Sequence, residues 1–119
     1  MRPFQELIVW QKAHAVTLAI YRESAKFPRE EQYGLISQVR RSSSSVPTNI
    51  AEGSARESSR EFHQFLSVAL GSAAEVEYQI LLARDLGYLS ELVHVRLDAD
   101  VAEVKRMLVS LKKSLRANS

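Results

Sequence analysis

One pair of residues has the spacing that metal-binding helices use. Glu91 and His94 form a Glu-x-x-His sequence, which in helical bundles can supply a carboxylate and an imidazole to a di-iron site. Such a site needs two of these pairs and two further glutamates, and neither His14 nor His63 has an acid three residues before it. We therefore expect neither a metal ion nor another cofactor here, and interpret the pair as a surface pair near the start of a helix.

Carboxylates in the middle of the chain could also do chemistry. Glu52, Glu75 and Glu77 could act as paired acids, but Arg40 is expected to meet one of these acids in a structural ion pair. The predicted polar cluster consists of Arg40, Asn49, Glu52 and Glu75. Because no Ser-His-Asp order, phosphate loop or dinucleotide fingerprint occurs, the sequence favours a protein that is not an enzyme. A small ligand or metal held by inward-facing polar residues is the alternative function.

Basic side chains are a third candidate for function. Eleven of the sixteen basic residues are arginines, and from Lys105 to the C-terminus there are five basic residues and no acidic one. The residues expected to contact RNA or DNA are Arg40, Arg41, Arg56, Arg60, Lys105, Arg106, Lys112, Lys113 and Arg116. Such binding would not depend on base sequence and would fall steeply with salt. Alternatively, the cations of the last helix only compensate its dipole.

The composition predicts the elements that position these side chains. A chain of 119 residues with 45% hydrophobic and 25% charged residues fits one domain, residues 1–119. Four glycines and three prolines are too few for a turn-rich β protein, and the absence of cysteine suits the cytoplasm. No stretch reaches the roughly 20 apolar residues of a membrane span. We expect a soluble, cytoplasmic, all-α protein that does not bind membranes.

Apolar residues recur every three or four positions in four segments, which indicates four amphipathic helices. Their expected ranges are about 7–26, 30–53, 58–85 and 90–115. Ser58 and Glu61 have the spacing of a capping box, and Gly87 predicts a left-handed helix end. Because the connections are short, neighbouring helices are expected to run antiparallel, as an up-down-up-down four-helix bundle.

The run RRSSSSVPTNIAEG, residues 40–53, has the composition of a linker, but the apolar pattern from Ile36 to Ile50 crosses it without interruption. We therefore expect one helix, kinked at Pro47. Proline cannot donate a backbone hydrogen bond, so the carbonyl of Ser43 loses its helical partner. Neighbouring serine hydroxyls or a water are expected to replace it. Gly53 is expected to end the helix as a C-cap.

Three stretches resemble a known family: VWQKAH, FPREEQYGLISQVRRSSSSVPTNIAEG and EFHQFLSVALGSAAEVEYQILLARDLGYL. The family consists of small four-helix-bundle proteins encoded in intervening sequences of bacterial 23S ribosomal RNA genes, often labelled ribosomal protein. It is related to the accessory protein of diversity-generating retroelements, which binds nucleic acid. The resemblance covers about residues 4–90. It implies a cytosolic antiparallel bundle that assembles into homo-oligomeric rings, with pentamers as the known form, and a nucleic acid or a nucleic-acid enzyme as partner.

Two features of the residues themselves favour self-association. Ser42 and Ser45 give the second helix a slim polar face that a second subunit could approach, although a merely solvated face would look the same. Phe4 and Trp10 lie at the front of the first helix, where the sequence LIVW is apolar around most of the helix circumference. We expect these four residues at a subunit interface.

Overall fold

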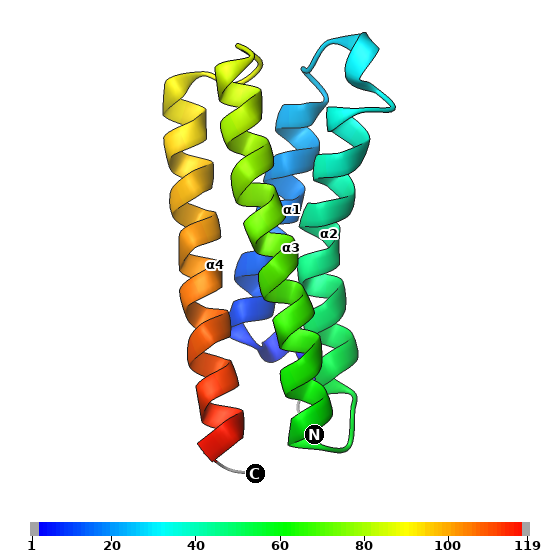
Figure 1. Cartoon of the computed structure of the whole chain (residues 1–119), viewed down its shortest axis with the longest axis vertical. Helices are drawn as coiled ribbons and strands as arrows, with labels where there is room; N and C mark the ends of the chain where they lie inside the picture. Colours follow the sequence, from blue (N-terminus) through cyan, green and yellow to red (C-terminus); the bar gives the residue numbers. More distant parts are fainter. Residues whose placement is uncertain (1–2, 118–119) are drawn as a thin grey trace.

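The structure is a computed structural model that describes residues 3–117. Its elements are the 3-10 turn η1 (Phe4–Glu6), α1 (Ile8–Ser24), the 3-10 turn η2 (Arg29–Glu31), α2 (Leu35–Ser54), α3 (Ser59–Asp85) and α4 (Glu91–Ala117). The four helices alternate in direction within a body of 46 × 23 × 20 Å (Figure 1). The α2–α3 connection, the start of α1 and the end of α4 share one end, which we call the terminal end. The predicted up-down-up-down four-helix bundle is confirmed.

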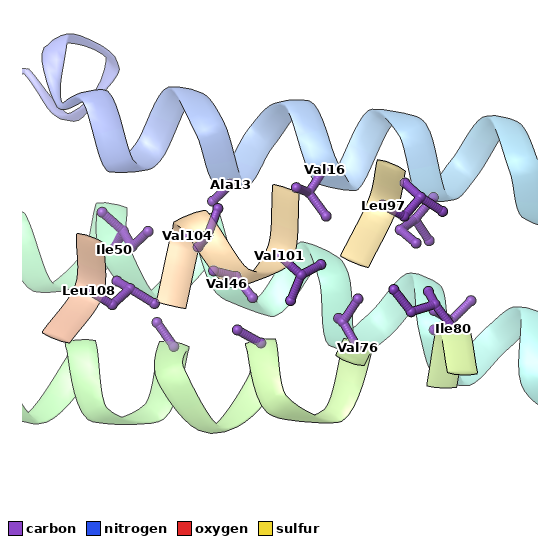
Figure 2. Close-up of a cluster of buried hydrophobic side chains, with 14 of the residues drawn as sticks. Ala13, Val16, Val46, Ile50, Val76, Ile80, Leu97, Val101, Val104 and Leu108 are labelled. Carbon is purple, nitrogen blue, oxygen red and sulfur yellow. The ribbon is translucent and has the colours of Figure 1, made fainter. Parts of the chain in front are cut away.

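All four helices contribute to one apolar core. Side chains from each helix point toward the bundle axis and meet there (Figure 2). The labelled members are Ala13, Val16, Val46, Ile50, Val76, Ile80, Leu97, Val101, Val104 and Leu108. Two small spaces between the helices measure about 10 Å³ each, which is room for one water at most. Neither space could hold the small ligand of the alternative function unless core side chains moved.

The second helix begins later than the expected residue 30. Gly34 has φ −109° and ψ −112°, outside the helical region, and α2 starts after it at Leu35. Glu31 from η2 caps the helix, because its Oε1 accepts a hydrogen bond from the Leu35 N–H at 3.1 Å. The other carboxylate oxygen of Glu31 accepts a hydrogen bond from the Tyr88 hydroxyl at 3.0 Å. This bond raises the pKa of Tyr88 and ties η2 to the α3–α4 connection.

The helix α2 runs through Pro47 as one element, so the stretch is a helix and not a linker. The carbonyl oxygen of Ser43 accepts a hydrogen bond from Thr17 Oγ1 of α1 at 2.9 Å. The expectation that a neighbouring serine hydroxyl would do this is wrong. The hydroxyls of Ser42, Ser43 and Ser44 donate to carbonyls of the preceding turn, and that of Ser45 contacts Ser72 of α3. Ser43 Oγ donates to the Arg40 carbonyl at 3.2 Å. A hydroxyl on another helix therefore replaces the bond that proline removes.

Two of the three helix ends predicted from single residues are present in the structure. Gly87 has φ +82° after α3, and the Ser58 hydroxyl accepts a hydrogen bond from the Glu61 N–H at 3.1 Å, so both predictions are confirmed. The prediction for Gly53 is wrong, since it is a buried residue inside α2 and not a C-cap. A Cβ at Gly53 would lie 2.7 Å from Phe65 Cβ, so this glycine lets α2 and α3 approach each other.

By length and mean hydropathy, 1.2 over its most apolar window, α3 could also cross a membrane. The expectation that no segment approaches such a span therefore does not hold by this measure. The core helix of a bundle passes the same test, and α3 buries Leu66, Val76 and Ile80 among the other three helices. That packing accounts for part of its apolar character, since 33% of the most apolar window is buried.

A candidate nucleic-acid interface between α3 and α4

The predicted ion pair of Arg40 does not form. Arg40 Nε donates to Ser24 Oγ at 2.9 Å, and its Nη2 donates to the Tyr21 carbonyl at 3.2 Å. The guanidinium also lies 4.7 Å from the centre of the Tyr21 ring, in a cation–π contact. Arg40 therefore caps the C-terminal end of α1, where the helix dipole favours a cation, instead of meeting Glu52 or Glu75.

Of the other members of the predicted polar cluster, only Asn49 belongs to a polar contact between α2 and α3. Asn49 Nδ2 donates to the Ser45 carbonyl at 2.8 Å and to Ser45 Oγ at 3.0 Å. Ser45 Oγ is in turn 2.9 Å from Ser72 Oγ of α3. Glu52 and Glu75 are exposed and stand outside this hydroxyl–amide network. The cluster is therefore a neutral contact between two helices, and not the charged cluster that the sequence predicted.

The serine face expected at a subunit interface is used within the subunit. Ser42 is 7% exposed and its hydroxyl donates to the Gln38 carbonyl at 3.0 Å, while Ser45 meets Ser72. Phe4 and Trp10 remain half-buried, with ring centres 4.9 Å apart, and Trp10 stacks on His14 at 4.8 Å. Ser42 is thus buried within the subunit, and Ser45 contacts α3. For these two serines, and for Phe4 and Trp10, a role in assembly stays a prediction.

Glu91 and His94 point to different environments. Glu91 is exposed and lies 3.8 Å from Arg84, whereas His94 is only 7% exposed and neither of its ring nitrogens has a hydrogen-bond partner. The interpretation as a surface pair is therefore wrong for His94, which belongs to the buried side of α4. Within residues 3–117, no three acidic or histidine side chains gather as a metal site would need.

The cations of α2 and of the following connection lie apart from those of α4. Arg41 Nη2 donates to Ser37 Oγ at 3.2 Å on the same helix, and Arg40 is held against α1. The Arg56 guanidinium lies 4.8 Å from the centre of the Phe65 ring. None of these three arginines is among the described residues that line the hollows between α3 and α4.

Four of the remaining predicted cations line two hollows between α3 and α4. A middle groove of about 620 Å³ is lined by Ser67, Leu70, Gly71, Ala74, Lys105, Arg106 and Val109. A terminal cleft of about 360 Å³ follows it toward the terminal end and is lined by Ser59, Arg60, His63, Gln64, Leu115 and Arg116. Lys112 and Lys113 lie between these two stretches in the sequence of α4, but they are not among the residues that line either hollow. The structure thus places four of the nine predicted cations at the two hollows: Arg60, Lys105, Arg106 and Arg116.

Acidic side chains are missing from the walls of both hollows, since none of the described residues that line them is Asp or Glu. Just beyond the groove, Lys105 Nζ donates to Glu77 Oε1 at 2.8 Å, in an ion pair that joins α4 to α3. Lys105, Lys112 and Arg116 follow at steps of seven and four and therefore share one face of α4. The result is a basic strip beside an apolar floor.

These features define a class of protein: an antiparallel four-helix bundle with a closed core and an open, basic seam along two of its helices. The family model of the 23S rRNA-intervening sequence proteins matches residues 5–110, and the chain belongs to this family. The resemblance seen in the sequence is thereby confirmed.

A solved structure shares the fold. It is a protein of unknown function from the S23 ribosomal protein family of Bacteroides thetaiotaomicron VPI-5482, with a TM-score of 0.80 and 25% sequence identity. The match covers 89% of this chain and 99% of that chain. The comparison with curated proteins finds no match.

Proposed function

We propose that this protein is a non-enzymatic helical bundle that assembles with copies of itself in the cytoplasm and serves as a scaffold or accessory factor that contacts RNA or DNA. The observation that carries the proposal is the α3–α4 seam, whose two hollows have cationic walls and no carboxylate among the described lining residues. A surface of this kind attracts polyanions through their phosphates and does not read base sequence.

The electrostatics of one subunit are weak, with a formal net charge of +2. Assembly would repeat the seam on each copy, and a polyanion that reaches several copies binds through avidity even where a single contact is weak. A homo-oligomeric ring, with five subunits as the family resemblance implies, would present the strip in that way. This gives self-assembly a direct use in the proposed function.

Exposed apolar side chains support the assembly. Tyr78 and Leu81 of α3 are 61% and 37% exposed, and Val95 of α4 is 54% exposed. These residues lie between the Lys105–Glu77 ion pair and the Arg84–Glu91 ion pair along the two antiparallel helices. They are therefore on the side of the middle groove that points away from the terminal end. Neighbouring exposed apolar side chains of this size are typical of a protein interface. We infer that this upper part of the seam contacts a second subunit.

Sedimentation velocity at micromolar concentration tests the assembly. The wild type is expected to sediment as an oligomer, and Leu81→Arg to sediment as a smaller species because it places a charge in the interface. Leu18→Arg is the matched control, since Leu18 is 45% exposed on α1, away from the seam. A monomeric wild type, or equal behaviour of the two variants, would contradict this interface.

Retention on immobilised RNA across a salt series tests the nucleic-acid contact. The wild type should be retained at low salt and released as salt rises, because cations displaced from the phosphates re-bind them at high salt. A protein that flows through at low salt would remove the nucleic-acid part of the proposal and leave the assembly part to be decided by sedimentation.

A further inference from the structure

We propose that two copies of the chain pair through their α4 helices, which lie antiparallel across a two-fold axis at Ala102. The inference rests on the self-assembly part of the proposed function, and it names the surface that each copy contributes to one contact. A two-fold contact closes with two copies, so by itself it makes a dimer, and it would join two rings where rings form.

The two halves of α4 carry opposite charge. Residues 91–104 hold four acidic side chains and one arginine, whereas residues 105–117 hold five basic side chains and no acidic one. A second α4 that runs in the opposite direction places the acidic half of each copy beside the basic half of the other. A parallel arrangement would set like charges against each other, so the charges favour the antiparallel one.

The flank of α4 beside the open seam has the spacing that such a pair needs. Its residues follow at steps of three and four and therefore share one face of the helix: Val95, Asp98, Ala102, Arg106 and Val109. Asp98 and Arg106 each lie four positions from Ala102, and Val95 and Val109 each lie seven positions from it. In an antiparallel pair centred on Ala102, Asp98 therefore meets Arg106 of the second copy, and Val95 meets its Val109.

These side chains are available for a partner. Val95 and Val109 are 54% and 38% exposed. Within residues 3–117, neither Asp98 nor Arg106 forms a hydrogen bond or an ion pair. Ala102 at the centre is small, which lets two helices approach closely. Because the contact is two-fold, each of these pairs occurs twice in the dimer.

The middle groove gives the second copy a place to lie. Arg106 and Val109 line this groove together with Gly71 and Ala74 of α3. A glycine inside a helix is destabilising relative to alanine, and a Cβ at Gly71 would meet no atom within 4 Å, so no described residue of the subunit uses the missing side chain. In the proposed pair, Val95 of the second copy lies at the height of Val109 and passes over Gly71. The glycine then serves the approach of another chain.

The paired stretch ends before the terminal cleft. Glu91 and Lys113, each eleven positions from Ala102, form the outermost pair of opposite charges. Glu91 is 3.8 Å from Arg84, but its side chain stays 74% exposed and can face a second cation. The helix α4 reaches the terminal cleft only at Leu115, beyond this stretch. The dimer would thus use the middle groove for assembly and keep a terminal cleft at each end for a polyanion.

Sedimentation velocity over a range of concentrations measures the dissociation constant and tests the pairing. Asp98→Arg and Arg106→Glu each set like charges together twice per dimer and should raise the dissociation constant about tenfold. Asp100→Arg is the matched control, because it makes the same change of charge at an exposed residue on the opposite side of α4. Circular dichroism checks that all three variants fold as the wild type does.

An equimolar mixture of Asp98→Arg and Arg106→Glu gives the sharpest test. In a mixed pair, one copy brings two cations and the other brings two carboxylates, so both charged contacts are complementary again. The mixture should therefore associate as tightly as the wild type, although neither variant does so alone. The double variant Asp98→Arg/Arg106→Glu should also associate, because its charges are exchanged within each pair.

The failures of the two proposals are separable. If the wild type associates and Asp98→Arg behaves like Asp100→Arg, or if the mixture associates no better than its components, the α4 pairing is wrong while self-assembly stands. A wild type that forms only dimers, which Asp98→Arg dissociates, would support the pairing and contradict the ring. A wild type that is monomeric at micromolar concentration would overturn both.

Discussion

The helix α3 has two sides that differ in how closely the neighbouring helix approaches. On the α2 side, a Cβ at Gly53 would lie 2.7 Å from Phe65 Cβ, and the hydroxyls of Ser45 and Ser72 are 2.9 Å apart. On the α4 side, a Cβ at Gly71 would meet no atom within 4 Å, and a groove of about 620 Å³ lies beside it. Small residues thus occur on both sides, but they close one seam and leave the other open.

This difference shows that small side chains do not indicate an interface by themselves. Ser42 is buried and the Ser45 hydroxyl contacts Ser72 of α3, so both small side chains already serve contacts within the subunit. Gly71 and Ala74 keep a hollow in the surface, and cations stand at its border. The open side is therefore where function is expected, and the closed side is where stability is expected.

Adding a methyl group on the closed α2 side of α3 should cause the largest change in the free energy of unfolding. Gly53→Ala places a methyl group against Phe62 and Phe65, and overpacking of this kind costs up to about 3 kcal/mol of the free energy of unfolding. Urea unfolding monitored by circular dichroism measures the loss. A variant as stable as the wild type would show that α2 and α3 can separate without cost, and would erase the contrast between the two sides.

Removing the donor that replaces the proline bond should have the next largest effect. Thr17→Val leaves the Ser43 carbonyl without a hydrogen-bond donor and should cost about 1–2 kcal/mol of the free energy of unfolding, measured by urea unfolding. In a Pro47→Ala background the backbone N–H at residue 47 is restored, so the same Thr17→Val change should cost less. An equal cost in both backgrounds would mean that Thr17 does not substitute for the missing N–H.

Filling the open side should stabilise the chain. Gly71→Ala adds a methyl group where there is space and should raise the free energy of unfolding by about 1 kcal/mol, because alanine is the better helix former. Urea unfolding of Gly71→Ala beside Gly53→Ala makes a matched pair, since both exchange a helical glycine for alanine. A loss of stability at Gly71 would show that the groove is less open than it looks.

Removing the ion pair at the border of the open α4 side should cause the smallest change in the free energy of unfolding. The side chains of Lys105 and Glu77 are 31% and 42% exposed, so Lys105→Met should change the free energy of unfolding by less than about 1 kcal/mol. The change should shrink further in high salt, which urea unfolding at two salt concentrations would show. A loss comparable to that of Gly53→Ala would make this border part of the core.

Much of the architecture was predictable because it depends on local patterns. The 3,4 spacing of apolar residues, the Ser58–Glu61 box and Gly87 each act within one or two turns of chain, and the helices and ends that they predict are present. Gly53 also carried a usable signal, since it follows Ile50 by three residues on the buried stripe. That position indicates packing more strongly than termination.

The candidate site was harder to predict, because it depends on which helix faces which. The acid that Arg40 was expected to meet lies on α2 or α3, but the partner is the end of α1, and no local pattern specifies that choice. The meeting of Arg60 with Arg116 likewise follows from the antiparallel register of α3 and α4 across more than fifty residues of sequence. The sequence predicted these cations singly, and the fold selects which of them share a surface.

The hydrogen bond from Thr17 to the Ser43 carbonyl has a consequence for the order of folding. Alone in water, the segment of α2 would carry a gap in its ladder at Pro47, and its two halves would form and melt separately. The bond that bridges the gap belongs to α1, so α2 becomes one cooperative unit only when α1 docks. We therefore expect the α1–α2 hairpin to be structured early, with Thr17 among the residues whose contacts are present in the folding transition state.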